Sequence, residues 1–306
     1  MKTQLLIHPE ELSEHWIERA AGCGVDVLGI HPVGGGLAHE SLADLLRRLE
    51  TPEFRTLLDK AAEKGLQIEY ELHAGSFLAP RDLFANHPEY FRETSAGVRS
   101  ADVNFCPSSP EMLDIVAQNA VKFAAKLYRS TKNYYFWLDD KKGGACHCPR
   151  CRLLSPSDQQ LLVMNRIVKE LRKTDPDARL AYLAYFQCIL PPKQIKPAPG
   201  IFLEYAPFEK DMKVRVSQSP VDKELNDLLH IFSPEDAKIL EYWYDNSLFS
   251  DWKKPPRRFT PDNSLIRDDI AFYRDKGIPY ISSFACYLGK DYEALYGEPD
   301  LSAFSR

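Results

Sequence analysis

Residues 133–151 have the sequence NYYFWLDDKKGGACHCPRC, and the fold prediction starts from them. An aromatic, strand-like run ends in two adjacent carboxylates, Asp139 and Asp140, and a Gly-Gly loop follows. In α/β enzymes, the side chains that follow a buried strand usually carry the chemistry. The stretch therefore predicts a strand that delivers Asp139 and Asp140 to the rim of an active site.

Seven more strand-like runs alternate with helical patterns along the chain. The eight predicted strands span 3–9, 25–33, 66–75, 133–140, 178–186, 200–207, 237–246 and 278–287. This alternation indicates βαβ units and a parallel sheet. Eight units in about 290 residues are typical of a (β/α)8 barrel, and an open doubly wound sheet is the alternative. No Gly-x-Gly-x-x-Gly follows a strand, which favours the barrel. We predict the α/β class, with residues 1–306 as a single TIM-type barrel domain.

The composition restricts the possible partners. Hydrophobic residues make up 44% of the 306 residues and charged residues 27%, as in an ordinary globular protein. The net charge of −5 argues against nucleic acid, because phosphate binding needs a basic surface. No apolar run approaches the roughly 18 residues that span a bilayer, so we expect no membrane partner. The oligomeric state is not indicated.

The N-terminus and the cysteines bear on the compartment. The first residues, MKTQLLIHPEEL, lack the pattern of a signal peptide. Of the seven cysteines, Cys23, Cys106, Cys188 and Cys286 stand singly. An odd, scattered set suits a reducing compartment better than a disulfide framework. We expect a cytoplasmic location, and secretion stays open in case a leader was removed.

Polar side chains recur where the predicted strands end, which is where a barrel places its chemistry. This ring comprises His8, His31, His73, Asp139, Asp140, Tyr185, Gln187, Glu204, Glu209, Tyr244, Asp245 and Tyr287. Any one of them could be structural, but the recurrence predicts a cleft. We expect the substrate to contact His31, His73, Tyr185, Trp243, Tyr244, Asp245 and Tyr287, with the aromatic rings stacking on sugars. A catalytic metal on His8, His31 and His73 is an alternative.

The two adjacent aspartates are the first candidates for acid–base chemistry. Glycoside hydrolysis typically needs two carboxyl groups in different protonation states. Close carboxylates raise one another's pKa, which favours keeping one of them as an acid. Consecutive strand residues point to opposite faces, so Asp139 and Asp140 form a pair only if the strand end is irregular. A loop cap or a salt bridge to Lys141 or Lys142 is the structural alternative.

The cysteines of the same block predict a separate feature. Cys146, Cys148 and Cys151 can supply three ligands of a tetrahedral zinc ion, and Cys106 is the candidate for the fourth. A disulfide and free thiols stay open as alternatives. We expect a structural role for this loop and no cofactor for catalysis.

These residues resemble a bacterial barrel family, long of unknown function, that is now grouped with glycoside hydrolases. The resemblance extends from about His87 to Tyr287. It rests on HPEYF (87–91), CPSSPEMLDIV (106–116), the Asp-x-x-x-Gly and Cys-x-Cys-x-x-Cys block, Asn165, Ala184-Tyr185, Glu209 in PFEKDM, and YWYDN (242–246). The family accompanies glycan-degrading systems and includes endo-β-N-acetylglucosaminidases.

The resemblance implies hydrolysis of a glycan that contains an N-acetylhexosamine. In a substrate-assisted route, one carboxylate orients the acetamido group and another protonates the leaving oxygen. We expect Asp139 or Asp140 in one role and Glu209 in the other. Ala285 stands where the family usually carries a glutamate, which keeps a non-catalytic glycan-binding or regulatory barrel as an alternative. A metal-dependent hydrolase that uses the strand-end histidines is the third possibility.

Overall fold

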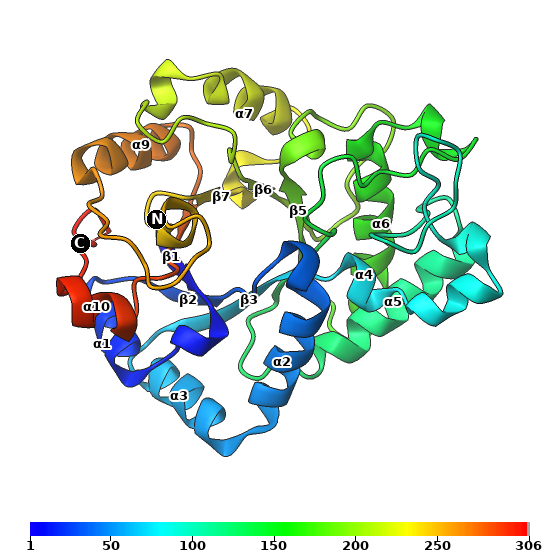
Figure 1. Ribbon diagram of the computed structural model, residues 1–306. Helices are drawn as coiled ribbons and strands as arrows, with labels where there is room; N and C mark the ends of the chain where they lie inside the picture. Colours follow the sequence, from blue (N-terminus) through cyan, green and yellow to red (C-terminus); the bar gives the residue numbers. More distant parts are fainter. Residues whose placement is uncertain (305–306) are drawn as a thin grey trace.

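The computed structural model describes residues 1–304 and contains a closed barrel of eight parallel strands (Figure 1). The strands are β1 (Lys2–Ile7), β2 (Val27–Ile30), β3 (Gln67–His73), β4 (Asn133–Trp137), β5 (Arg179–Ala184), β6 (Ile201–Tyr205), β7 (Lys238–Glu241) and β8 (Tyr280–Phe284). Each strand pairs with the next, and β8 pairs with β1. The predicted (β/α)8 barrel is confirmed, although several predicted strands end earlier than expected.

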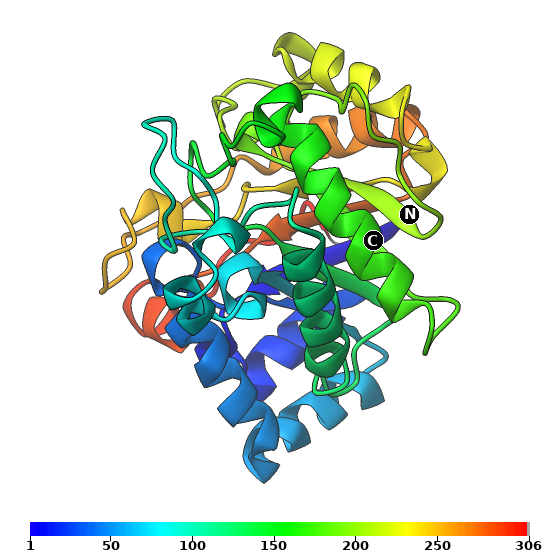
Figure 2. The same cartoon turned by 90° about the vertical axis from the view of Figure 1, so that its right-hand side faces the viewer.

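Helices surround the strands (Figures 1 and 2). They are α1 (Glu14–Gly22), α2 (Ala38–Glu50), α3 (Pro52–Glu63), α4 (Gly75–Leu78), α5 (Pro110–Ala124), α6 (Pro156–Leu171), α7 (Val221–Leu229), α8 (Asn246–Phe249), α9 (Asn263–Asp275) and α10 (Lys290–Tyr296). Among residues 1–304, no helix is both long and apolar enough to cross a membrane.

Local sequence explains where the long helices α5 and α6 begin. The Ser109 hydroxyl accepts a hydrogen bond from the amide of Met112, and Pro110 takes the first helical position of α5. Ser155 and Asp158 form a reciprocal capping box at the start of α6. Such caps satisfy amide groups that lack a partner within the helix. They fix the points at which the loops of the barrel mouth return to the outer helices.

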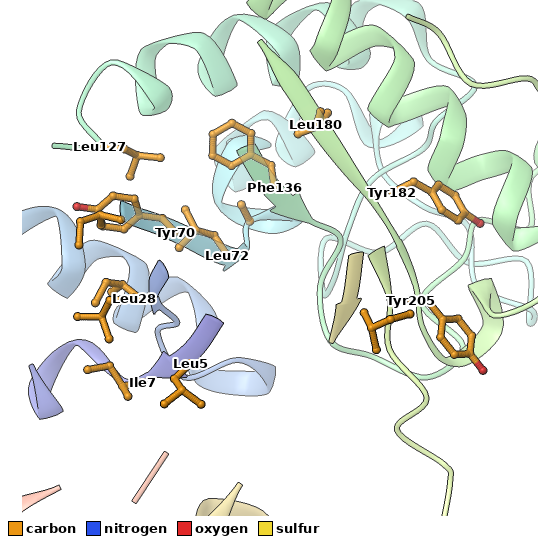
Figure 3. Close-up of a cluster of buried hydrophobic side chains, with 14 of the residues drawn as sticks. Leu5, Ile7, Leu28, Tyr70, Leu72, Leu127, Phe136, Leu180, Tyr182 and Tyr205 are labelled. Atoms are coloured by element: carbon orange, nitrogen blue, oxygen red, sulfur yellow. The ribbon is translucent and has the colours of Figure 1, made fainter. Parts of the chain in front are cut away.

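Strand β3 shows how the sequence divides between two cores. Ile68, Tyr70 and Leu72 belong to the hydrophobic layer between the strands and the helices, part of which Figure 3 shows. Glu69 and Glu71 alternate with them, and both are fully buried inside the barrel. Successive strand residues point to opposite faces. The polar face of β3 is therefore turned to the barrel interior rather than to solvent.

One lysine balances the glutamates of the barrel interior. The Nζ atom of Lys238 lies 2.5 Å from Glu71 Oε1 and 2.8 Å from Glu204 Oε1. Burial raises the pKa of Glu71 above its usual range, whereas the carboxylates raise the pKa of Lys238 in spite of its burial. The other oxygen of Glu204 accepts a hydrogen bond of 2.8 Å from the indole nitrogen of Trp137. The ion pair between Lys238 and Glu204 thus holds in place the carboxylate that binds Trp137.

Candidate active site

A cavity of about 360 Å³ opens at the C-terminal ends of the strands. Its principal lining residues are His8, His31, Gly34, His73, Trp137, Asp140, Leu183, Tyr185, Phe208, Leu240, Tyr242, Asp245, Trp252, Phe284 and Cys286. We call this cavity the cleft. A TIM barrel places its active site at this end, so the cleft is the candidate active site.

Three histidines form one side of the cleft, each held in the same way. The Nδ1 atoms of His8, His31 and His73 lie 2.8 Å from the backbone oxygens of His31, Glu71 and Leu138 respectively. A carbonyl oxygen only accepts, so each Nδ1 carries the proton. Burial, with His73 and His8 nearby, lowers the pKa of His31 well below its usual value. The neutral His31 ring therefore leaves Nε2 as an acceptor for a ligand hydroxyl.

The histidines do not gather around a single point. The ring centroids of His8 and His31 are 6.1 Å apart, and those of His31 and His73 are 5.8 Å apart. Within residues 1–304, the only group of side chains whose ligand atoms lie close enough to share one ion is the cysteine cluster. The alternative of a catalytic metal on these histidines therefore finds no support in their arrangement.

Asp140 is the cleft carboxylate that follows β4. The hydroxyl of Tyr185 donates to Asp140 Oδ1 over 3.2 Å, which fixes the carboxylate at the wall of the cleft. Asp140 is only partly buried, and Glu209 lines a different groove rather than the cleft. A carboxylate in this position can act on a ligand from the β4 side.

Asp245 is the second cleft carboxylate, and it caps α8. Its Oδ1 atom accepts hydrogen bonds from the Ser247 hydroxyl and from the amides of Ser247 and Leu248. Because these three bonds end on one oxygen, Oδ2 is the atom that could contact a ligand. Burial raises the pKa of Asp245, although the hydrogen bonds and the nearby His8 oppose the rise. A raised pKa is what a carboxyl group needs to serve as a general acid.

Tyr242 lines the cleft together with these two carboxylates. Burial raises its pKa well above the usual range, and Tyr185, Asp245 and Asp140 add to the rise through their charges. Both aspartates are therefore near enough to act electrostatically on one phenol group. The cleft combines two carboxylates in unlike surroundings, which is the arrangement that acid–base chemistry requires.

Aromatic rings form the floor and the rim of the cleft. Trp137, Tyr242 and Phe284 line the floor, while Trp252 lies at the edge with 59% of its surface exposed. Trp252 and Tyr287 both adopt positive φ angles, 55° and 62°. A left-handed backbone at a bulky residue costs on the order of 1–3 kcal/mol and tends to cluster at ligand sites. The rim is thus built to present flat rings, as sugar-binding surfaces do.

Asp139 faces away from the cleft and joins three segments. Its carboxylate accepts hydrogen bonds from the Ser76 amide at 2.8 Å, from the Ser76 hydroxyl, and from the Asn104 amide at 2.6 Å. Its own amide donates to Asn104 Oδ1 over 2.8 Å. Gly75 permits this close contact, because a Cβ atom there would lie 2.5 Å from Asn104 Oδ1. The two adjacent aspartates therefore have separate tasks, and they do not form an acid–base pair with each other.

The change Asp139→Ala is expected to lower the free energy of unfolding by about 1–3 kcal/mol for each buried donor left without a partner. Ser76 and Asn104 would lose their acceptor, while Asp140 would keep its bond to Tyr185. Urea denaturation of the variant beside the wild type measures the loss. Unchanged stability would show that the hydrogen bonds of Asp139 do not stabilise the fold.

Three other sequence-based site predictions need correction. Glu209 lies on the surface, where it pairs with Lys142 over 2.8 Å and borders a neighbouring groove. Trp243 and Tyr244 pack in the outer core, where they donate hydrogen bonds to Asp269 and Asn263. Strand β7 ends at Glu241, and its inward face continues through Leu240 to Tyr242. Because facing alternates along a strand, Tyr242 occupies the place that was predicted for Trp243.

The remaining predicted residues are near one another. His31, His73, Tyr185, Asp140 and Asp245 all line the cleft. Tyr287 lies at its rim, with its ring 5.9 Å from that of His8. The sequence did not lead us to Tyr242, Phe284 and Trp252, which also line the cleft. The signal for Tyr242 was present, since it lies two residues after an inward-facing leucine.

The fold and the site define a class of protein. Its members are closed parallel barrels with carboxylates and aromatic rings at the mouth. Residues 47–290 match the family described as a domain of unknown function, DUF4838, and the chain belongs to this family. No curated protein matches the chain in sequence.

Solved structures with a similar fold include glycosidases. A β-galactosidase from Rahnella sp. R3 has a TM-score of 0.58 at 13% identity, covering 93% of this chain and 50% of that one. A mutant O-GlcNAc hydrolase from Thermobaculum terrenum has a TM-score of 0.54 at 13% identity, covering 97% and 57%. Endo-glycoceramidase II from Rhodococcus sp., in complex with a cellobiose-like imidazole, has 0.51 at 12%, covering 93% and 72%. The chain thus spans about half the length of the first two, and the likeness concerns the fold.

Proposed function

We propose that this protein is a glycoside hydrolase that acts on a glycan containing an N-acetylhexosamine. The observation that carries the proposal is the pair of cleft carboxylates, Asp140 and Asp245, which lie in unlike surroundings beside Tyr242. Glycosidases use two carboxyl groups of different protonation state. The barrel that this chain shares with the β-galactosidase and the O-GlcNAc hydrolase supports the reaction class.

The surroundings of the two carboxylates suggest their roles. Asp245 is buried and its pKa is raised, so it suits the acid that protonates the leaving oxygen. Asp140 is more open and is held by Tyr185, so it suits the negative charge that stabilises the sugar cation or orients the acetamido group. Asp140 and Asp245 replace the pair of a β4 aspartate and Glu209 that the sequence resemblance favoured.

The choice of an N-acetylhexosamine rests on the resemblance to endo-β-N-acetylglucosaminidases and on the O-GlcNAc hydrolase among the similar folds. Trp252 offers a flat apolar surface at the rim, and His31 and His73 offer ring nitrogens to hydroxyl groups.

The direct test is hydrolysis of a panel of aryl N-acetylhexosaminides, other aryl glycosides and N-glycans, with products identified by mass spectrometry. We expect cleavage next to an N-acetylhexosamine. Binding of these sugars without any cleavage would instead support the glycan-binding alternative. Cleavage of other glycosides alone would keep the hydrolase and overturn the substrate class.

The change Asp140→Asn is expected to lower kcat by about 10²- to 10³-fold, the usual effect of removing one electrostatic contact to the transition state. The amide keeps the size of the side chain and can still accept from Tyr185. The measurement is turnover of the best substrate in the panel, at equal melting temperature. A variant with wild-type kcat would remove Asp140 from the reaction.

A further inference from the structure

The sulfur atoms of four cysteines lie close together beside the loops of the cleft. Cys106 precedes α5, while Cys146, Cys148 and Cys151 lie in the loop between β4 and α6. All four side chains are buried, and their sulfur atoms lie within 4.8 Å of one another. The sulfur of Cys106 is 3.7 Å from that of Cys148 and 3.8 Å from that of Cys151.

These distances fit the edges of a tetrahedron around one metal ion. A zinc–sulfur bond of about 2.3 Å gives sulfur–sulfur edges of about 3.8 Å in a tetrahedral site. A disulfide would need about 2.05 Å between the sulfur atoms. An iron–sulfur cluster would hold its cysteines farther apart, since several iron atoms lie between them. A single ion with soft thiolate ligands matches the cluster best.

The surroundings of the cluster suit a negatively charged metal–thiolate centre. The amide of Glu93 donates to Cys146 Sγ over 3.3 Å, and the Ser108 hydroxyl lies 3.0 Å from Cys151 Sγ. The guanidinium of Arg99 is near enough to Cys106 for the two charges to interact. Four thiolates around a divalent ion carry two negative charges, which such donors and a cation stabilise.

We propose that Cys106, Cys146, Cys148 and Cys151 bind one structural Zn²⁺ ion with tetrahedral geometry. All four positions are filled by the protein, which is the pattern of structural rather than catalytic zinc. This proposal is independent of the hydrolase proposal.

The zinc would join two loops that otherwise have little regular structure. The loop between α4 and α5 and the loop before α6 also meet through the hydrogen bond from the His147 amide to the Glu93 oxygen, at 2.8 Å. Figure 1 shows both loops on the same side of the barrel, next to α5 and α6. The side chain of Gln159 in α6 bonds to the backbone of Cys146 and Cys151. The ion would thus fix both loops to α6, close to the hydrogen bond between Asn104 and Asp139.

The first test is the zinc content of the protein purified without added chelator, measured by mass spectrometry of the metal. We expect about one zinc ion per chain, since one structural site takes one ion. The variant Cys148→Ser should lose at least half of the zinc and melt at a lower temperature. The matched control is Cys188→Ser, which removes a buried cysteine outside the cluster and should keep the zinc. Wild-type protein that purifies without zinc and takes up none would overturn the proposal, as would iron in its place.

A second test works on the wild-type chain even if the cysteine variants fail to fold. Alkylation under native conditions should spare the four cluster thiols in the zinc-loaded protein and modify them after treatment with a strong chelator. Refilling the emptied site with Co²⁺ should give the intense near-ultraviolet absorption of thiolate–cobalt charge transfer. Equal alkylation with and without zinc, or a cobalt spectrum without that absorption, would contradict a tetrathiolate site.

Discussion

The change Asp245→Asn is expected to reduce turnover by about 10²- to 10⁴-fold, the usual contribution of a general acid. The fold should survive, because asparagine is as good a helix cap as aspartate and keeps an oxygen for the Ser247 and Leu248 amides. The loss should be larger for glycans with a poor leaving group than for aryl glycosides, because the aryl group leaves without protonation. Steady-state kinetics on both kinds of substrate measure the difference.

The pH dependence of the rate is a second test of Asp245 as the general acid. The raised pKa of Asp245 keeps its carboxyl group protonated to higher pH than usual, so the wild-type rate should fall as the pH rises through that pKa. This limb of the profile should vanish in Asp245→Asn. An equal loss on good and poor leaving groups, with the alkaline limb unchanged, would show that Asp245 is not the acid.

The variant Glu209→Gln separates the structure-based assignment from the sequence-based one. Glu209 is an exposed partner of Lys142, so its removal should leave kcat close to the wild-type value. A hundredfold loss there, with Asp245→Asn active, would restore the original pair of carboxylates.

The change Lys238→Met is expected to lower the free energy of unfolding by about 3–5 kcal/mol, because it leaves buried charges without their partner. Glu71 and Glu204 both contact this lysine, and all three side chains are fully buried. Urea denaturation at neutral pH measures the effect. The matched control is Lys132→Met, an exposed lysine that pairs with Asp175 and Asp177 and should change stability little.

The loss in Lys238→Met should also depend on pH. Burial raises the folded-state pKa of Glu71 and Glu204 above the unfolded value. Protons then bind more tightly to the folded form, so the stability of the variant should recover as the pH falls through the folded-state pKa. A loss below about 1 kcal/mol, or one that is the same at all pH values, would contradict the role of Lys238 as the central counter-charge.

The sequence predicted the barrel because strand and helix periods alternate regularly, and all eight strands formed. It did not predict which face of each strand turns inward. The pattern of β3 is polar at Glu69 and Glu71 and apolar at Tyr70 and Leu72, which is equally consistent with a solvent-facing polar side. Only closure of the barrel places the glutamates inside, opposite Lys238 from a strand 167 residues away.

The sequence predicted where the site lies, but it predicted only some of the residues that form it. Recurrent strand-end residues gave the histidines, Asp140, Tyr185 and Asp245, because parallel strands end at one rim. The separate tasks of Asp139 and Asp140 depend on Ser76 and Asn104, which are 63 and 35 residues away from Asp139. Such long-range partners leave no local signal. Cys106 was predicted to join the other three cysteines, and its sulfur does lie beside theirs.

The most direct test of the central claim is a crystal structure of the Asp245→Asn variant with a bound glycan that the wild type cleaves. We expect the scissile linkage in the cleft above Trp137, with its oxygen within about 3.2 Å of the side chain at position 245 and with Asp140 beside the same sugar. A glycan bound instead in the groove around Glu209, or with its linkage out of reach of both positions, would contradict the proposed active site.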